Sequence, residues 1–256
     1  YEINGRTGMF ILDSTNTNGY TIPDQGISFH WYSRGSFIVT DENGNTHVFG
    51  TLRRDTTIVE SPHSQTISFN STWYLDHSEN IYGERINYSY QMHPNVCYDM
   101  YDRYGAISVS GGNTSAYQSR GETTRIRLQT YYLSGINCNS GRIDFRYSPN
   151  TNSGIGDLKL DEIAIYSINN QYLRSIRFDY SLFTSNSPEK ALRLDKIYQY
   201  GDSTSLFINA FTYYDHMTLP ARSSLDYDHW GYFNNARNAT PAPGFIHNNR
   251  QYAGAS

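Results

Sequence analysis

Cysteine is scarce in this sequence. Only Cys97 and Cys138 occur among the 256 residues, without a CxxC pair, a third thiol or a neighbouring pair of histidines. A structural zinc site needs such a cluster, so we expect none. A disulfide between Cys97 and Cys138 and two free thiols both fit the sequence.

Charge and long apolar runs are limited as well. Charged residues make up 17% of the chain, and the formal net charge is −4. Such a chain has no basic field that would attract nucleic acid or anionic lipid. No apolar run approaches the roughly 20 residues of a membrane-spanning helix. We therefore expect no nucleic-acid partner and no membrane-spanning segment.

The motifs of common catalytic and cofactor sites are missing too. The eight histidines are dispersed, without the HxH or HExxH spacing that places two imidazoles on one metal ion. There is no GxSxG elbow, phosphate-binding loop or dinucleotide fingerprint. We therefore predict no catalytic residues, no metal site and no cofactor, and we expect that the protein is not an enzyme.

Strand-forming and turn-forming residues are abundant instead. The chain contains 24 Tyr, 12 Phe and 20 Gly, together with many Asn, Ser and Thr residues. Aromatic residues favour pleated sheets, and Gly, Asn and Ser favour turns. No stretch keeps a helical period over several turns. The composition therefore predicts an all-β protein with many short strands.

Internal repeats occupy the second half of the chain. The stretch LKLDEIAIYSINNQYLRSIRFDY (158–180) is followed by LRLDKIYQYGDSTSLFINAFTYY (192–214), so that Leu-x-Leu-Asp-x-Ile recurs. Each stretch ends in aromatic-x-Tyr, which also occurs at residues 88–90 and 145–147. Two alternating runs joined by a polar link predict a β-hairpin. Asp161 and Asp195 hold equivalent positions in the repeat, which favours a structural role over catalysis.

These patterns predict repeated antiparallel β-hairpins that form a large curved, wound sheet, because one hairpin cannot bury its apolar face alone. A β-sandwich is the alternative. Residues 1–72 are predicted as an N-terminal β-hairpin region with a strong hairpin at 36–50. Residues 73–216 form the repeated hairpins, with an insertion and flexible loop at about 95–122. Residues 217–256 form an aromatic corner and a C-terminal loop that leads to a missing part of a longer chain.

The densest cluster of candidate binding residues is LDYDHWGYFNN, which contains Asp228, His229, Trp230 and Tyr232. Aromatic rings with polar neighbours can stack on a sugar ring and bind its hydroxyl groups. The same residues also fit a packing corner, in which Trp230 belongs to the core and Asp228 caps the backbone. The sequence therefore leaves two interpretations of this cluster, a binding site and a structural corner.

Several motifs together resemble one family. The order NGRTGMF, FIVTDENGNTHVFG, STWYLDHSENIYGERINYSY, the Leu-x-Leu-Asp-x-Ile hairpins and LPARSSLDYDHWGYFNN is similar to the region upstream of, or within, the repeats of bacterial Rhs/YD-repeat-like proteins. The resemblance implies a long secreted or cell-surface polypeptide. In such a protein, hairpins wind into a shell that is associated with a variable C-terminal effector or toxin.

The leading hypothesis is therefore a structural β-repeat module that supports or encloses another region, its partner being the remainder of its own polypeptide. The alternative is a β-domain that binds a glycan or another surface protein. A third hypothesis is an enzyme that acts on glycans. The chain starts at Tyr1 without an initiating Met, so we expect it to be a segment of the longer protein.

Overall fold

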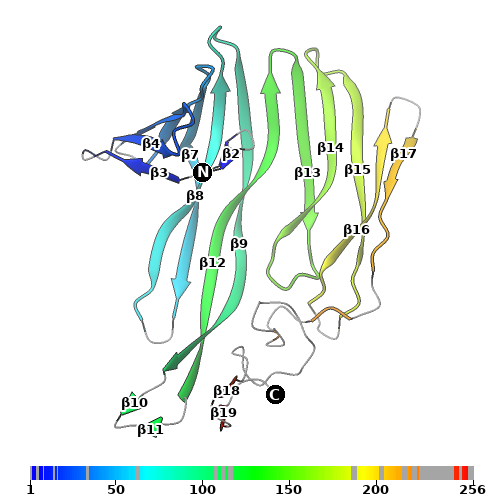
Figure 1. Cartoon of the computed structure of the whole chain (residues 1–256). Helices are drawn as coiled ribbons and strands as arrows, with labels where there is room; N and C mark the ends of the chain where they lie inside the picture. The colour runs from blue at the N-terminus through cyan, green and yellow to red at the C-terminus, as the bar shows by residue number, and fades with distance from the viewer. Residues whose placement is uncertain are drawn as a thin grey trace.

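The computed structural model of the chain is built from β-strands (Figure 1). The structure describes residues 2–3, 6–7, 9–13, 15, 17–32, 35–61, 64–106, 109–110, 113–114, 118–185, 189–201, 205–214, 218–220, 224, 245–247 and 250–252. These residues include no helix, and hence none with the length and apolarity that crossing a bilayer requires.

The strands follow one another along the chain with short connections. They are β1 (Glu2–Ile3), β2 (Arg6–Thr7), β3 (Met9–Leu12), β4 (Asn18–Ile22), β5 (Ser28–Trp31), β6 (Phe37–Thr40), β7 (Thr46–Glu60), β8 (Ile67–Glu79), β9 (Arg85–Ala106), β10 (Val109–Ser110), β11 (Asn113–Thr114), β12 (Gln118–Cys138), β13 (Gly141–Pro149), β14 (Leu158–Ser167), β15 (Tyr172–Leu182), β16 (Leu192–Tyr200), β17 (Ser205–Ala210), β18 (Phe245–His247) and β19 (Arg250–Tyr252).

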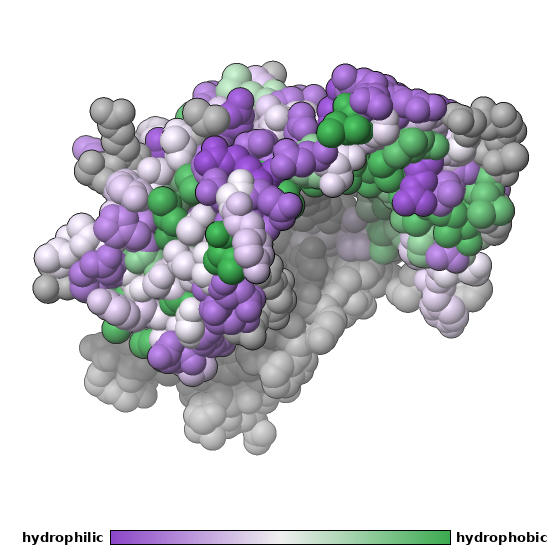
Figure 2. All heavy atoms as spheres, turned by 90° about the horizontal axis from the view of Figure 1, so that it is seen from above, coloured by the Kyte–Doolittle hydropathy of each residue, from purple (hydrophilic) through white to green (hydrophobic). Residues whose placement is uncertain are grey.

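One 13-stranded sheet contains most of these strands, in the order β17-β16-β15-β14-β13-β12-β9-β8-β7-β6-β5-β4-β3. Strand neighbours in it pair antiparallel. Seen down the strands, the described residues form a curved band (Figure 2). The all-β prediction of repeated antiparallel hairpins in a large sheet is confirmed, and it describes these strands better than the β-sandwich alternative. The predicted boundary at residues 72–73 lies inside β8.

The repeated hairpins are β8–β9, β12–β13, β14–β15 and β16–β17, and they share one irregularity. In each first strand a leucine precedes a bulged residue, at which the register with the preceding strand shifts. These steps are Leu75–Asp76, Leu133–Ser134, Leu160–Asp161 and Leu194–Asp195. The ladder to the second strand of the hairpin ends at the same level. The leucine carbonyl therefore needs another donor there.

A tyrosine supplies this donor in all four hairpins. The hydroxyl groups of Tyr90, Tyr147, Tyr180 and Tyr213 donate to the carbonyl oxygens of Leu75, Leu133, Leu160 and Leu194, with distances of 2.9, 2.9, 2.9 and 2.8 Å. We call each bond a Tyr latch. The aromatic-x-Tyr pattern therefore marks the level at which the two strands of a hairpin separate.

A large bulge interrupts β7 and begins at Gly50. This residue has a φ of 69°, which glycine adopts without steric cost. The register of β7 against β8 resumes only at Arg54. The amide of Thr51, inside the bulge, donates to the carboxylate of Asp76 at 2.7 Å. The bulged residue of the first repeated hairpin thus stabilises the bulge of the neighbouring strand.

Aromatic residues form the core beside this bulge. Its buried members are Ile27, Phe29 and Val39, with Phe37 and Phe49 packed against them. The rings of Phe37 and Phe49 stack with centroids 4.9 Å apart. Trp73 lies against Gly50, and its indole nitrogen donates to the carbonyl of Gly35 at 2.6 Å. This core therefore holds the N-terminal hairpins against β8.

Beyond the bulge, β7 also pairs with β12, through residues 56–60 and 125–129. Where this ladder ends, the buried carboxylate of Asp55 accepts hydrogen bonds from the Tyr74 hydroxyl at 2.9 Å, the Thr130 hydroxyl at 3.1 Å and the Tyr131 amide at 3.2 Å. Strands β7, β8, β9 and β12 are therefore joined in a closed circuit of pairings.

The predicted insertion at about 95–122 is mostly paired where it is described. Most of it extends β9 and β12, whose ladder continues as far as the pair Ala106 and Gln118 (Figure 1). The short β10–β11 pair follows at the far end. Gly111 and Gly112 lie outside the described residues. The described part of the insertion is therefore a long β-hairpin arm.

The chain buries little apolar surface for its size. Its accessible surface is 16964 Å², whereas a compact monomer of 29.4 kDa exposes about 11,500 Å². The buried apolar side chains among the described residues are Ile27, Phe29, Val39, Val96, Ile126 and Ala164. A single-layer sheet accounts for this, since neither face is covered by a second layer of described strands.

Candidate functional site

The last hairpins present an apolar face. Antiparallel partners point to the same side of a sheet, and so do alternate residues along a strand. By this rule the registers place Ile143, Phe145, Ile163, Ile165, Ile176, Phe178 and Ile197 on one face of β13–β16. All of them are only partly buried. At the edge of this apolar face, Leu206 of β17 is 62% exposed. The registers place Asp144 and Arg146 on the opposite face from Ile143 and Phe145.

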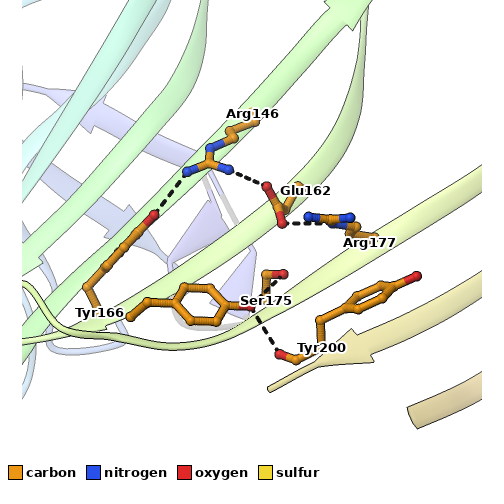
Figure 3. A network of polar contacts seen from close by, with 7 residues as sticks. Arg146, Glu162, Tyr166, Ser175, Arg177 and Tyr200 are labelled. Atoms are coloured by element: carbon orange, nitrogen blue, oxygen red, sulfur yellow. Dashed lines mark hydrogen bonds and ion pairs between the residues drawn. The ribbon is translucent and has the colours of Figure 1, made fainter. Parts of the chain in front are cut away.

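The opposite, polar face is organised around Glu162 (Figure 3). This glutamate lies between two arginines, with Arg146 Nη1 at 2.5 Å from one carboxylate oxygen and Arg177 Nε at 2.9 Å from the other. Its side chain is 10% exposed, whereas the two arginine side chains are 55% and 54% exposed. The three residues come from neighbouring strands at the same level of the sheet.

Tyrosines extend this network over the polar face. Tyr166 accepts a hydrogen bond from Arg146 at 2.9 Å, and the hydroxyl of Tyr172 donates to Ser175 at 3.0 Å. The Arg177 guanidinium lies 4.7 Å from the centroid of the Tyr200 ring, a cation–π contact. These long side chains lie over small residues, so that Ala164 and Ser175 are fully buried in a single-layer sheet. On the polar face, long polar side chains therefore shield the small residues from solvent.

Opposing influences set the pKa of Glu162. Burial is the largest influence and raises the pKa, because it disfavours the charged carboxylate. Hydrogen bonds from Ser175 and Arg177, and the positive charges of Arg177 and Arg146, outweigh burial and lower the pKa below its usual value. Glu162 is therefore a charged, structural carboxylate and is poorly suited to donate a proton at neutral pH.

The two repeated aspartates have local partners. Asp161 bonds to the ammonium group of Lys159, and Asp195 accepts from Arg193 Nε at 2.9 Å. Both occupy the bulge that follows the leucine of a Tyr latch. Their positions and partners match the structural role that the repeat predicts.

The predicted binding cluster of Asp228, His229, Trp230 and Tyr232 lies outside the described residues. Both cysteines are described, and both are free thiols. Cys97 stands opposite Arg127 of β12, whereas Cys138 is the last residue of that strand. Along β12, the position opposite Cys97 and Cys138 itself are therefore separated by eleven residues, each with a rise of about 3.3 Å. Of the two alternatives, free thiols are therefore correct and the disulfide is wrong.

Sequence reasoning missed two polar groups. Glu162 could not be identified as the centre of a network, because its arginine partners lie on other strands and only the register shows that they meet. The pair Asp41 and His47 was missed because the turn between β6 and β7 brings them together, with His47 Nε2 at 3.6 Å from a carboxylate oxygen of Asp41. A search for acid and histidine residues across predicted hairpin turns would have found this pair.

The described residues contain no group of three or more His, Cys, Asp or Glu side chains that could hold a metal ion. Comparisons with protein-family models, with curated proteins and with solved structures found no match. The functional argument therefore depends on the fold and on the chemistry of its surfaces.

Proposed function

We propose that the chain is a structural β-repeat module of a large Rhs/YD-repeat-like secreted or cell-surface bacterial protein. In this proposal its apolar face supports or encloses another region of the same polypeptide, such as a C-terminal effector. The observation that carries the proposal is the contrast between the two faces of β13–β16.

The polar face is suited to water. Its arginines and tyrosines satisfy one another and shield the small residues beneath them. The apolar face consists mainly of isoleucine and phenylalanine side chains that are only partly buried by their neighbours, and the registers add Arg174 and Gln199 to it. Burying apolar area is favourable by about 25 cal/mol per Å². A second surface that covers this face would therefore gain stability, whereas covering the polar face would cost desolvation.

The repeated Tyr latch supports the module part of the proposal. All four hairpins use the same leucine, bulge and tyrosine hydroxyl. Because each hairpin satisfies its own leucine carbonyl in the same way, a further hairpin can be added to the sheet without changes in the adjacent hairpins. This favours a scaffold of repeated hairpins over a domain shaped around one reaction.

The test compares the native, full-length polypeptide with this chain alone by hydroxyl-radical footprinting and mass spectrometry. Phe145 and Phe178 report on the apolar face, and Tyr200 reports on the polar face as the matched control. We expect the two phenylalanines to be labelled several-fold less in the native polypeptide, because another region covers them. Tyr200 should be labelled equally in both samples.

Equal labelling of Phe178 in the two samples would overturn the enclosing role. The mass of the native secreted polypeptide tests the other half of the proposal. If that polypeptide is no longer than this chain, it is not a module of a larger protein.

A further inference from the structure

Three hairpin turns enclose a cleft of about 450 Å³ at one end of the sheet. The turns are those between β6 and β7, β8 and β9, and β12 and β13. The cleft is lined by Asp41, Asn45, His47, Ser78, Glu79, Asn80, Glu84, Arg85, Ile86, Cys138, Asn139 and Ser140. Its volume is in the range of small-molecule sites, but most of the residues that line it are polar or charged, whereas a typical site is lined mainly by hydrophobic and aromatic residues.

Asp41 and His47 lie on one wall of this cleft. The Nδ1 atom of His47 is 2.9 Å from the hydroxyl of Ser78, its direct cross-strand partner. The Nε2 atom is buried, makes no hydrogen bond and lies 3.6 Å from Asp41, which is too far for one. A buried polar atom without a partner is a standing cost to the fold.

Ser78, His47 and Asp41 are the residue types of a catalytic triad, but their hydrogen bonds do not suit acyl transfer. Asp41 already accepts bonds from the amides of Asn43 and Asn45 at 2.9 Å each and from the Asn45 side chain at 2.9 Å. Asp41 therefore stabilises the turn. It does not orient the imidazole, which the carboxylate of a catalytic triad must do.

The turns hold the cleft in shape before any ligand arrives. Asn80 accepts from the amides of Tyr82 and Glu84 at 2.9 Å each, which fixes the turn between β8 and β9. An added Cβ on Gly44 would lie 3.0 Å from Ile81, so the first two turns are in close contact. A preformed site loses less conformational entropy on binding.

We propose that this cleft binds a neutral saccharide. The exposed turn residues Asn139 and Ser140, with the hydroxyl of Ser78, offer donors and acceptors side by side, and a sugar hydroxyl needs both. Its three carboxylates, Asp41, Glu79 and Glu84, outnumber its one guanidinium, Arg85, so these four groups carry a net charge of −2, from three negative charges and one positive charge. This charge disfavours anionic ligands. The site is separate from the apolar face that carries the proposed scaffold function.

The experiment screens the intact chain on an array of neutral and sialylated glycans, then measures the best neutral glycan by calorimetry. We expect Ser78→Ala and Asn139→Ala each to weaken binding about tenfold, the effect of losing one or two hydrogen bonds. Asn139 lies in an exposed turn, so its variant tests the cleft without disturbing the core. The matched control is Asn169→Ala, in the exposed turn between β14 and β15.

In the bound chain, the His47 ring signals in an NMR spectrum should shift, which a remote site would not cause. The proposal is overturned if no neutral glycan binds, if sialylated glycans bind more tightly than their neutral counterparts, or if Asn139→Ala binds as well as Asn169→Ala.

Discussion

The hydroxyl of Tyr180 donates a hydrogen bond to the carbonyl oxygen of Leu160 at 2.9 Å, across the open end of the β14–β15 hairpin. The ladder between these strands stops at the pair Glu162 and Arg177. Asp161 is bulged, which turns the Leu160 carbonyl out of regular register with β13. The tyrosine hydroxyl thus replaces a backbone donor, and this explains why Leu-x-Leu-Asp and Phe-x-Tyr occur together.

Replacing Tyr180 with phenylalanine tests this latch. The variant keeps the ring and loses the hydroxyl, so the Leu160 carbonyl is left without its donor. We expect the free energy of unfolding to fall by about 1 kcal/mol, the usual net contribution of one hydrogen bond. Urea unfolding followed by circular dichroism measures the change. Tyr82→Phe is the control, because Tyr82 is 83% exposed in a turn; equal losses for both variants would contradict the latch.

Replacing Glu162 with glutamine tests the polar face. The Glu162→Gln variant keeps the shape of the side chain but removes the charge that Arg146 and Arg177 share. We expect a loss of about 1–3 kcal/mol, since hydrogen bonds to a largely buried charge are stronger than neutral ones. Glu60→Gln is the matched control, because the Glu60 pair with Arg127 is exposed and should contribute at most about 0.5 kcal/mol. Similar losses for both variants would show that the network adds nothing.

The same carboxylate predicts a pH dependence. The pKa of Glu162 is lower in the folded chain than its usual value of 4.5. Its stabilising effect is therefore fully present above the unfolded pKa and is lost as the pH falls through the folded pKa. We expect the urea midpoint to fall as the pH drops below about 4.5, and to fall less steeply in Glu162→Gln. The slope that remains should come from the other carboxylates whose pKa values are lowered, which are Asp13, Asp41, Asp99 and Asp195. Parallel profiles for the two proteins would contradict this assignment.

The hairpins and their turns could be predicted because their signals are local. The turn at residues 41–45 follows from its composition, and alternation places Ile143 and Phe145 on one face. The repeat also identified the latch tyrosines by position, although not by role. Their role depends on where the ladder stops, and this is a property of two strands together.

Features that depend on register could not be predicted. Arg146 and Arg177 meet Glu162 only because three strands align at one level. The pairing of β7 with β12 joins segments far apart in the sequence, and Asp55 gives no local sign of its role at the end of that ladder. The long arm of β9 and β12 was predicted only as an insertion because it breaks the repeat, although its backbone remains paired.

The contact between Gly50 and Trp73 yields a prediction about packing. Gly50 and Gly83 both have positive φ values, 69° and 80°. An alanine Cβ at Gly50 would overlap the Trp73 indole, whereas one at Gly83 would meet nothing within 4 Å. Gly83→Ala therefore costs only the strain of a left-handed alanine, about 1 kcal/mol. Gly50→Ala should cost about 1–3 kcal/mol more, because the indole must move out of a packed core.

Comparing the two alanine variants separates backbone strain from overlap. Urea unfolding gives the stability of each, and tryptophan fluorescence reports on the indole that Gly50 contacts. Because Trp73 also donates to the Gly35 carbonyl, displacing it should shift the emission of Gly50→Ala and leave that of Gly83→Ala unchanged. If both variants lose the same stability with unaltered fluorescence, the glycine at position 50 serves only its backbone conformation, and the bulge of β7 does not depend on Trp73 packing.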